Sequence, residues 1–235
     1  MTRRRWIADE YDEERAALLE QNAAHLARVL RASVGQEYDI VCGERVRAGS
    51  IVSITDERVE FALSDVVEAR AERELVLVLA IYKFDRMEWA IEKCTELGVT
   101  RIIPVIARRT NAHLGTASAK RVERWRRIAH QAAQQSRRQR VPQIEGVVKL
   151  KSALELNAEV RLVLNENERA KKISDAVKKT DSMMAFAVGP EGGWAEEELA
   201  AFEVSGWQSV TLGSQILRAE TAAIAVLAAV AAILD

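Results

Sequence analysis

The stretch MAFAVGPEGGWAEEEL, residues 184–199, decides the fold, because it passes from an apolar strand through a glycine-rich turn into a helix. Met184–Val188 is apolar throughout, as in a strand that is buried on both faces of a parallel sheet. GPEGG, Gly189–Gly193, then redirects the chain, and three glutamates open the next helix at Glu196–Glu198. In open α/β sheets ligands bind beyond the carboxyl ends of the strands, where this loop is expected to lie. Taken alone, however, a tight strand-to-helix turn explains the loop as well as a binding site does.

The composition of this loop bears on the charge of any ligand that it holds. Glycines allow the backbone to come close to a ligand and to adopt positive φ. An anion at the start of the following helix would meet three glutamates rather than a free helix N-terminus, which argues against a phosphate. The chain also contains neither GxGxxG nor GxxxxGK[ST], the usual nucleotide-binding signatures. The loop therefore favours a cationic or zwitterionic cofactor over a nucleotide.

A second glycine-bearing turn follows in LGSQILRAETA, Leu212–Ala222. It too comes after an expected strand and leads into a helix, and it places Arg218 and Glu220 next to an apolar stretch, where charged residues rarely lie without a role. The two could simply cap or bridge the helix start, and the pattern alone does not separate this from a functional role. Because two such turns at strand ends of one domain can form two walls of one pocket, we expect a single binding site.

Strands and helices alternate on both sides of these turns. Leu75–Tyr82 is a continuous apolar run, and the helix after it has Asp85 as its expected cap, Glu88 as the reciprocal residue and Gly98 as its end. The remaining strands are expected at Arg101–Ala107, Val160–Asn165, Met183–Val188 and Ser209–Leu212, and the remaining helices at Ser118–Ser136, Ala170–Lys178, Ala195–Val204 and Ala219–Leu234. Such an alternation predicts an α/β domain with a mostly parallel sheet.

The chain before this domain has a different pattern of apolar and polar residues. Residues 26–68 form short alternating segments such as Tyr38–Cys42, Gly49–Ile54 and Arg58–Leu63, separated by turn-prone residues. This pattern predicts a small β-barrel. We therefore place a domain boundary near residue 70, which divides the chain into residues 1–70 and 71–235, each long enough to bury a core of its own.

The net formal charge is only −1, but the charge is unevenly distributed. Residues 101–140 carry ten arginines and one lysine against a single acid, Glu123, an excess of about ten positive charges. A solvated helix face is the ordinary explanation for a charge run. An unopposed excess of this size instead favours a surface that binds a polyanion, and nucleic acid is the leading candidate.

Composition argues against several classes of protein. The first residues, MTRRRWIADEYDEE, lack the apolar core of a signal peptide, and the most apolar run, Ala222–Leu234, is too short to span a bilayer. Cys42 and Cys94 are far apart and provide neither a disulfide framework nor a metal-binding pair, and the three histidines have no ligand spacing. We therefore expect a cytoplasmic protein without a membrane segment or a metal site.

The two turns, taken together, resemble those of a known family. GPEGGWAEEEL and LGSQILRAETA are similar to the paired carboxy-terminal motifs of bacterial ribosomal RNA small subunit methyltransferase E, an enzyme of the SPOUT class. The resemblance extends to HLARVLRASVGQ (His25–Gln36), to KFDRMEWAIEKCTELGV (Lys83–Val99) and to QQSRRQRVPQI (Gln134–Ile144), and thus covers nearly the whole chain. The sequence departs from the family's pattern at Gln134, where we expect a glutamate, and at Arg3–Arg5, where an aromatic-rich start is usual.

The resemblance implies a fold and an activity. It implies a PUA-like β-barrel followed by a SPOUT-type α/β-knot methyltransferase domain that forms a homodimer, whereas general connection rules would lead to an unknotted sheet. It implies transfer of a methyl group from S-adenosylmethionine to N3 of one uridine in 16S ribosomal RNA, either as free RNA or in the small ribosomal subunit. Two other functions remain open, namely a SPOUT methyltransferase that acts on another RNA such as tRNA and an RNA-binding ribosome assembly factor without catalysis.

The resemblance also implies roles for individual residues. Arg218 is expected to stabilise negative charge on the uracil oxygens, and Glu220 or a water to accept the proton from N3, while a purely structural pair of the two remains open. The expected cofactor-binding residues are Leu164, Asn165, Gly189, Pro190, Glu191, Gly192, Leu212, Gly213, Ile216, Leu217 and Thr221. The expected RNA-binding residues, which combine the basic block with the motif at His25, are Arg28, Arg31, Arg108, Arg109, Arg137, Arg138 and Arg140.

Overall fold

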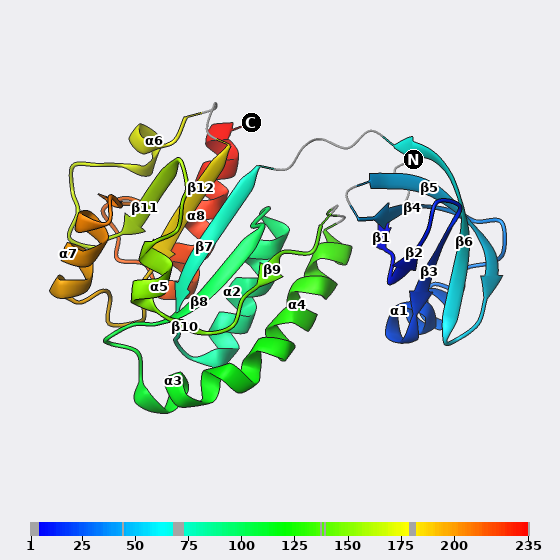
Figure 1. Cartoon of the computed structure of the whole chain (residues 1–235), viewed down its shortest axis with the longest axis horizontal. Coiled ribbons are helices and arrows are strands. Elements are labelled where there is room, and N and C mark those ends of the chain that lie inside the picture. Colours follow the sequence, from blue (N-terminus) through cyan, green and yellow to red (C-terminus); the bar gives the residue numbers. More distant parts are fainter. Residues whose placement is uncertain are drawn as a thin grey trace. The chain divides into compact units, whose positions relative to one another are not determined.

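The computed structural model describes residues 5–43, 45–67, 73–136, 138, 140–178 and 182–234. The chain divides into two units, which are drawn in Figure 1. The first contains residues 1–71 together with 133–140, and the second contains residues 72–132 and 141–235. The boundary expected near residue 70 falls within residues 68–72, which lie outside the described residues.

The first unit is built on a six-stranded sheet with the order β1-β4-β5-β6-β3-β2. Neighbouring strands are antiparallel, except that β1 and β4 are parallel. The strands are β1 Arg5–Ile7, β2 Glu10–Tyr11, β3 Arg15–Leu19, β4 Glu37–Cys42, β5 Arg45–Ile54 and β6 Arg58–Val67, and the helical segments are α1 Glu20–Ala24 and the π-helix η1 His25–Val29. Two register shifts interrupt the pairing of β5 with β6, and bulges of this kind bend a strand.

The core of the first unit is formed by one face of this sheet. Ile40, Ile51, Val59 and Phe61 are fully or almost fully buried, and Leu26 of η1 packs with them. Full burial of an apolar side chain of this size contributes about 1.5–3 kcal/mol relative to exposure. The strands and η1 therefore share one hydrophobic cluster, which fixes the start of the segment that carries Arg28 and Arg31.

The second unit contains a seven-stranded sheet in which every pairing is parallel. The order is β10-β8-β7-β12-β11-β13, and β9 pairs with β8 as well. The strands are β7 Glu74–Ala80, β8 Arg101–Ile106, β9 Gln143–Ile144, β10 Val148–Lys149, β11 Val160–Leu164, β12 Met183–Val188 and β13 Gln208–Val210. The α/β fold with a parallel sheet, which the alternation of elements predicted, is confirmed.

Helices cover both faces of this sheet because its strands are apolar on both sides. In β7, Leu75 and Leu77 face one layer, whereas Val76 and Val78 face the other. The first layer contains α2 Phe84–Glu96, α4 Val122–Gln135, α6 Ile173–Ala176 and α8 Ala219–Leu234, and the second contains α5 Leu150–Leu154 and α7 Glu196–Val204. The helical segments α3 Ala112–Ser118 and η2 Ala119–Arg121 precede α4.

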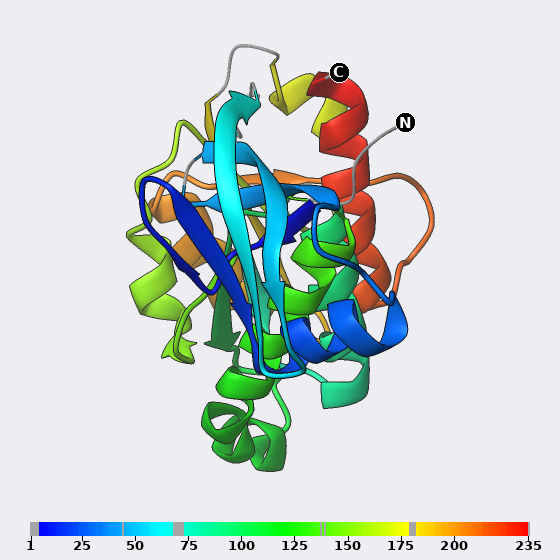
Figure 2. The same cartoon turned by 90° about the vertical axis from the view of Figure 1, so that its right-hand side faces the viewer.

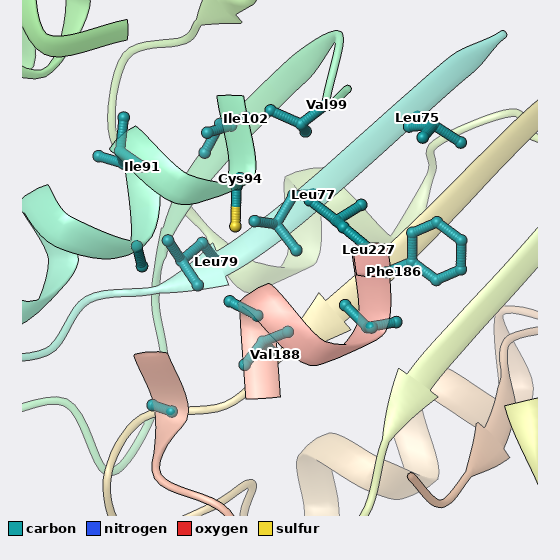
Figure 3. Close-up of a cluster of buried hydrophobic side chains, with 14 of the residues drawn as sticks. Leu75, Leu77, Leu79, Ile91, Cys94, Val99, Ile102, Phe186, Val188 and Leu227 are labelled. Atoms are coloured by element: carbon teal, nitrogen blue, oxygen red, sulfur yellow. The ribbon is translucent and has the colours of Figure 1, made fainter. Parts of the chain in front are cut away.

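The core under the first layer joins the central strands to two helices, as Figure 3 shows. Leucine side chains of β7 lie next to Cys94 of α2, and Leu227 of α8 lies near Phe186 of β12. Phe186, Cys94 and Leu227 are fully buried. The helix α8, red in Figures 1 and 2, thus packs against both α2 and β12 and is anchored by the centre of the sheet.

The strand order brings three strand ends together. β12 lies between β7 and β11, although β11 comes before it in the chain, and β13 lies beyond β11 at the sheet edge. The chain therefore leaves a place beside β7 that β12 later fills. Because these strands are parallel, β11, β12 and β13 all end at the same edge of the sheet, which is where ligands bind in such folds.

The start of α2 differs from its prediction. The helix begins at Phe84 with Lys83 as its N-cap residue, so that Asp85 lies inside the first turn and does not cap it. Glu88 is engaged elsewhere, because its two carboxylate oxygens accept hydrogen bonds from Arg124 of α4 at 2.7 Å each. The predicted capping pair is therefore wrong, and an ion pair between two helices takes its place.

Two other helices have different lengths from those predicted. The helix expected at Ala170–Lys178 is only the short α6, because the residue before it, Lys172, pairs with Thr211 in an isolated β-bridge. Helical structure expected from Ser118 already begins at Ala112, where the side chain of Asn111 accepts a hydrogen bond from the backbone N–H of His113.

Two properties of the described residues bear on the exclusions made from the sequence. None of their helices has the length and apolar character required to cross a bilayer. Both cysteines are buried free thiols, and burial raises the pKa of Cys42 to about 11. Because the thiolate is the reactive form, neither thiol is activated at neutral pH.

Candidate functional site

A cavity opens at the sheet edge where β11, β12 and β13 end. Its walls come from the last residue of each of these strands and from the segments that directly follow them, at residues 165–167, 189–191, 193–194, 211–213 and 215–217. Arg109, from the loop after β8, and residues of the first turns of α7 and α8 complete the lining. Both glycine-bearing turns therefore line one cavity.

Nine of the expected cofactor-binding residues lie in the wall of this cavity, namely Leu164, Asn165, Gly189, Pro190, Glu191, Leu212, Gly213, Ile216 and Leu217. Gly192 and Thr221 are not among the lining residues. The carbonyl oxygen of Gly192 accepts a hydrogen bond from Nη1 of Arg109 at 2.7 Å. Thr221 is exposed on α8. The structure thus brings most of the expected residues together and leaves these two outside.

The need for glycine in the 189–193 turn lies at its two ends. Gly193 has a φ of +69°, and a Cβ there would lie 3.2 Å from Oε1 of Glu166. A Cβ at Gly189 would lie 3.3 Å from the backbone nitrogen of Trp194. At Gly192 the nearest atom would be Cδ of Arg109 at 3.5 Å, which is an ordinary contact. Gly189 and Gly193 are therefore the constrained positions, and Gly192 is not.

The glutamates at the start of α7 hold this turn in place. Oε2 of Glu198 accepts a hydrogen bond from the backbone N–H of Ala195 at 2.9 Å, and Oε1 accepts one from the backbone N–H of Arg108 at 2.7 Å. Glu197 lies 3.4 Å from the guanidinium of Arg108. Glu198 thus closes the first turn of α7 and ties it to the loop after β8, so that the helix N-terminus is already occupied by a carboxylate.

The charge of the cavity wall is predominantly negative. Glu166, Glu191 and Glu196 line it, against Arg109. An acidic cavity favours a ligand with a positively charged group and disfavours a phosphate. No group of three or more metal-ligating side chains occurs among the residues that the structure describes.

Of the two arginines after β8 that were expected to bind RNA, Arg109 contacts the glycine turn and Arg108 contacts the start of α7. Arg109 is exposed and lines the cavity while its guanidinium holds the Gly192 carbonyl. Thr110 anchors the same loop, because its Oγ1 donates to the Ile81 carbonyl at 3.2 Å and accepts from the Ala107 N–H at 3.1 Å. The loop after β8 is therefore part of the cavity wall.

Arg218 and Glu220 do not form a pair in the structure. Arg218 is exposed, and its side chain makes no hydrogen bond or ion pair within the described part of the chain. Its neighbours Leu217 and Ala219 both line the cavity. The side chain of Glu220 is only 7% exposed, and its Oε1 lies 3.7 Å from Nε of Arg86. Arg86 therefore occupies the position next to Glu220 that the sequence left open for Arg218.

Several residues at the site were not singled out from the sequence, among them Arg86, Glu166 and Trp194. Glu166 and Trp194 line the cavity; Glu166 directly follows the expected residue Asn165, and Trp194 directly follows the GPEGG turn, which is the signal that could have found them. The Trp194 ring packs edge-on against Phe202 of α7 with 5.0 Å between ring centroids. Arg86 has no local signal, because its partners come from distant parts of the chain.

The expected RNA-binding residues of the first unit lie around η1. Arg28 forms an ion pair with Asp56 at 2.6 Å, and this hydrogen bond holds the pKa of Asp56 below its usual range. Arg31 is exposed and has a φ of +50°, a conformation that costs energy for a residue other than glycine. π-Helices and strained residues are frequent at functional sites, so that Arg31 stays a candidate contact.

The other expected RNA-binding residues differ in their exposure. Arg137 lies outside the described residues, Arg138 is buried and Arg140 is exposed. On α4 and the turn before it, Lys120 and Arg127 are exposed and form no ion pair among the described residues. The described part of the basic block thus contains both cations with acidic partners, such as Arg108 and Arg124, and cations without an ion pair, such as Lys120 and Arg127.

Comparisons with known proteins agree with this geometry. Residues 69–231 match the family model of an RNA methyltransferase domain. The chain is 38% identical to ribosomal RNA small subunit methyltransferase E of Mesomycoplasma hyopneumoniae over 156 residues, which are 65% of this chain and 67% of the relative. It is 31% identical to the Synechocystis protein of the same name over 221 residues, which are 90% of this chain and 71% of the relative.

A solved structure extends the likeness to the whole chain. The crystal structure of ribosomal RNA small subunit methyltransferase E from Neisseria gonorrhoeae bound to S-adenosyl methionine has a TM-score of 0.84 and 31% sequence identity, and the match covers 97% of this chain and 96% of that chain. Family model, relatives and structure agree, and the chain belongs to the family of ribosomal RNA small subunit methyltransferase E.

Proposed function

We propose that the protein transfers a methyl group from S-adenosylmethionine to N3 of a specific uridine in 16S ribosomal RNA of the small subunit. The observation that carries the proposal is the single cavity that both glycine-bearing turns line at the ends of three parallel strands. Arg218, whose guanidinium has no partner in the described part of the chain, lies directly between two residues of its wall.

The residues of the cavity fit S-adenosylmethionine. Its sulfonium and ammonium groups are positive, and the acidic wall supplies complementary charge. Apolar side chains, among them Val188, Leu199 and Val210, provide a surface for the adenine ring. The residues that would hold the cofactor are the nine lining residues expected from the sequence together with Glu166 and Trp194. When bound, S-adenosylmethionine supplies the methyl group.

Uridine N3 carries a proton at neutral pH and must lose it to act as a nucleophile. Arg218 is placed to stabilise the negative charge that then develops on the uracil oxygens, because its guanidinium is not neutralised by a carboxylate within the described residues. Of the two proton acceptors that the sequence left open, a water fits better than Glu220. The Glu220 carboxylate is buried beside Arg86 and does not line the cavity.

We further propose the finer architecture that the family resemblance implies. The mainly antiparallel sheet of the first unit supports a PUA-like β-barrel that binds RNA through Arg28 and Arg31. The insertion of β12 between two earlier strands, followed by the return of α8 to the sheet centre, supports a SPOUT-type knot in the second unit. Residues 1–70 and 71–235 are then the two domains of an enzyme that works on ribosomal RNA in the cytoplasm.

The first prediction concerns the cofactor. Gly193→Ala should weaken the binding of S-adenosylhomocysteine and cost about 1–2 kcal/mol of unfolding free energy, because it forces a side chain into the left-handed region and toward Glu166. Gly192→Ala is the matched control and should retain both properties, since its Cβ makes only an ordinary contact. Calorimetric titration and denaturant unfolding measure the two quantities. Equal affinities of the two variants would remove the turn from the cofactor site.

The second prediction concerns the reaction. The wild-type protein should produce 3-methyluridine in small-subunit ribosomal RNA, detected by nucleoside analysis, and Arg218→Ala should lower the single-turnover rate by about 100- to 1000-fold, as for loss of one preorganised donor. Cofactor affinity should barely change, and higher pH should partly restore the rate because it favours deprotonated uridine. Methylation of tRNA instead would support the other SPOUT activity, and binding of RNA without any methylation would support an assembly factor.

The third prediction concerns RNA binding. Lys120→Gln together with Arg127→Gln should flatten the log–log salt dependence of RNA affinity by up to about 2 units, if each cation neutralises one phosphate. Lys149→Gln with Lys151→Gln is the matched control, because these lysines are exposed at the start of α5, in the layer on the other face of the sheet. A salt slope that is the same in both double variants would exclude the α4 surface as a phosphate contact.

The fourth prediction concerns a homodimer. One face of α8 packs into the core, while the other face, with Ala225, Ala228 and Ala232, is partly exposed and carries no charge. A second copy of the chain would cover this face. Light scattering should therefore give about twice the chain mass of 26.2 kDa, and Ala228→Glu should shift it to the monomer. Val204→Glu, at an exposed position of α7, should leave the mass unchanged. A wild-type monomer at micromolar concentration contradicts the proposal.

A further inference from the structure

One arginine outside the cavity wall joins the two glycine-bearing turns. Arg86 lies in the first turn of α2, where its Nη1 is 3.9 Å from Oε1 of Glu191 and its Nε is 3.7 Å from Oε1 of Glu220. Glu191 belongs to the 189–193 turn and lines the cavity, and Glu220 lies two residues after Arg218. A single guanidinium thus faces a carboxylate from each motif.

The contact between Arg86 and Glu220 involves a carboxylate that is almost completely buried. Its side chain is 7% exposed, and its second carboxylate oxygen, Oε2, is buried without a hydrogen-bond partner among the described residues. The hydroxyl of Tyr82, which follows β7 by two residues, is likewise buried without a partner in this part of the chain. Burial raises the pKa of Tyr82, and Cys94 and the charges of Glu220 and Glu191 raise it further.

Stability alone is a poor explanation for such a cluster. An ion pair with one buried partner, such as Glu220 with the partly exposed Arg86, gains little over apolar side chains of similar volume, because the buried carboxylate loses its hydration. Here the geometry is also loose, since both Arg86 contacts exceed the usual length of a hydrogen bond. Glu220 also lies in the first turn of α8, where the partial positive charge of the helix N-terminus already favours an acidic side chain without Arg86. A role in orienting the two segments accounts for the arrangement better than a role in holding the fold.

We infer that Arg86 is a positioning residue for methyl transfer, which fixes the first turn of α8 and thereby Arg218 relative to the Glu191 side of the cofactor cavity. The inference rests on the proposed function. Arg86 itself is not among the residues that line the cavity, so it acts through Glu191 and Glu220. Without it, the guanidinium that links Glu220 at the start of α8 to Glu191 would be lost, and Arg218 would be placed less precisely relative to the cavity.

The test compares single-turnover methylation of small-subunit ribosomal RNA at saturating S-adenosylmethionine, with cofactor affinity and melting temperature measured beside it. Arg86→Met should lower the rate by about 10- to 100-fold, as small misplacements of reacting groups do. Arg86→Lys should recover part of the rate, because an ammonium group restores a positive charge between the two carboxylates. Lys93→Met is the matched control, since Lys93 also forms ion pairs on α2, and its partners among the described residues are Glu92 and Glu96 of the same helix. A rate for Arg86→Met equal to that of Lys93→Met would overturn the inference.

Two double variants separate positioning from folding. Arg86→Met in an Arg218→Ala background should cause no further loss of rate, because the residue that Arg86 orients is then absent, whereas multiplicative losses would overturn the inference. Arg86→Met should lower the melting temperature, because it leaves the buried carboxylate of Glu220 without its cation. Glu220→Gln in that background should restore the melting temperature but not the rate, since no unpaired buried carboxylate remains. Recovery of the rate together with stability would assign Arg86 to the fold alone.

The outcome for the wild-type protein distinguishes the two levels of the proposal. Absence of any methylation by the wild-type protein would refute the proposed function. If the wild-type protein methylates its RNA and the Arg86→Met variant retains the wild-type rate, only the positioning role is refuted.

Discussion

The burial of β12 at the centre of the parallel sheet is the constraint on which the second unit depends. Met184–Val188 is almost completely buried, with β7 on one side and β11 on the other. Burial of each large apolar side chain contributes about 1.5–3 kcal/mol, whereas an exposed ion pair contributes about 0–1 kcal/mol. The core therefore sets where the 189–193 turn lies, and the polar contacts around the cavity adjust a position that the core has already determined.

The burial of a strand could be predicted from its own residues, whereas its place in the sheet depends on distant parts of the chain. Leu75–Tyr82 and Met183–Val188 are apolar at every position, so that their burial on two faces was visible locally and is confirmed. Strand order is not a local property, and nothing in the sequence around β12 indicates that it fills the place between β7 and the earlier β11. The helix expected at Ala170–Lys178 failed for the same reason, because the β-bridge of Lys172 joins it to a strand end that comes much later in the chain.

At the candidate site, too, some residues could be predicted from the local sequence, whereas others depend on contacts with distant parts of the chain. The residues that line the cavity could be expected because they are contiguous with two motifs, although the motif did not reveal that Gly193 rather than Gly192 has the left-handed backbone. The contacts that Arg86 and Arg109 make at the cavity could not be predicted. A positive charge in the sequence does not show which carboxylate or carbonyl the fold will bring to it. Charge counts over residues 101–140 therefore overstated the free positive surface, since Arg108 and Arg124 have acidic partners.

These pairings have a consequence for the proposed reaction. An arginine that is neutralised by a carboxylate cannot also stabilise negative charge on uracil, and an acidic cavity beside Arg218 invites such neutralisation. The fold prevents it by giving Glu220 to Arg86 and Glu198 to backbone N–H groups, while Arg86 also faces Glu191. Of the acids that line the cavity, Glu191 thus faces Arg86, and no acid among the described residues forms an ion pair with Arg218. The guanidinium of Arg218 can therefore act on the uridine although it lies beside an acidic site for the methyl donor.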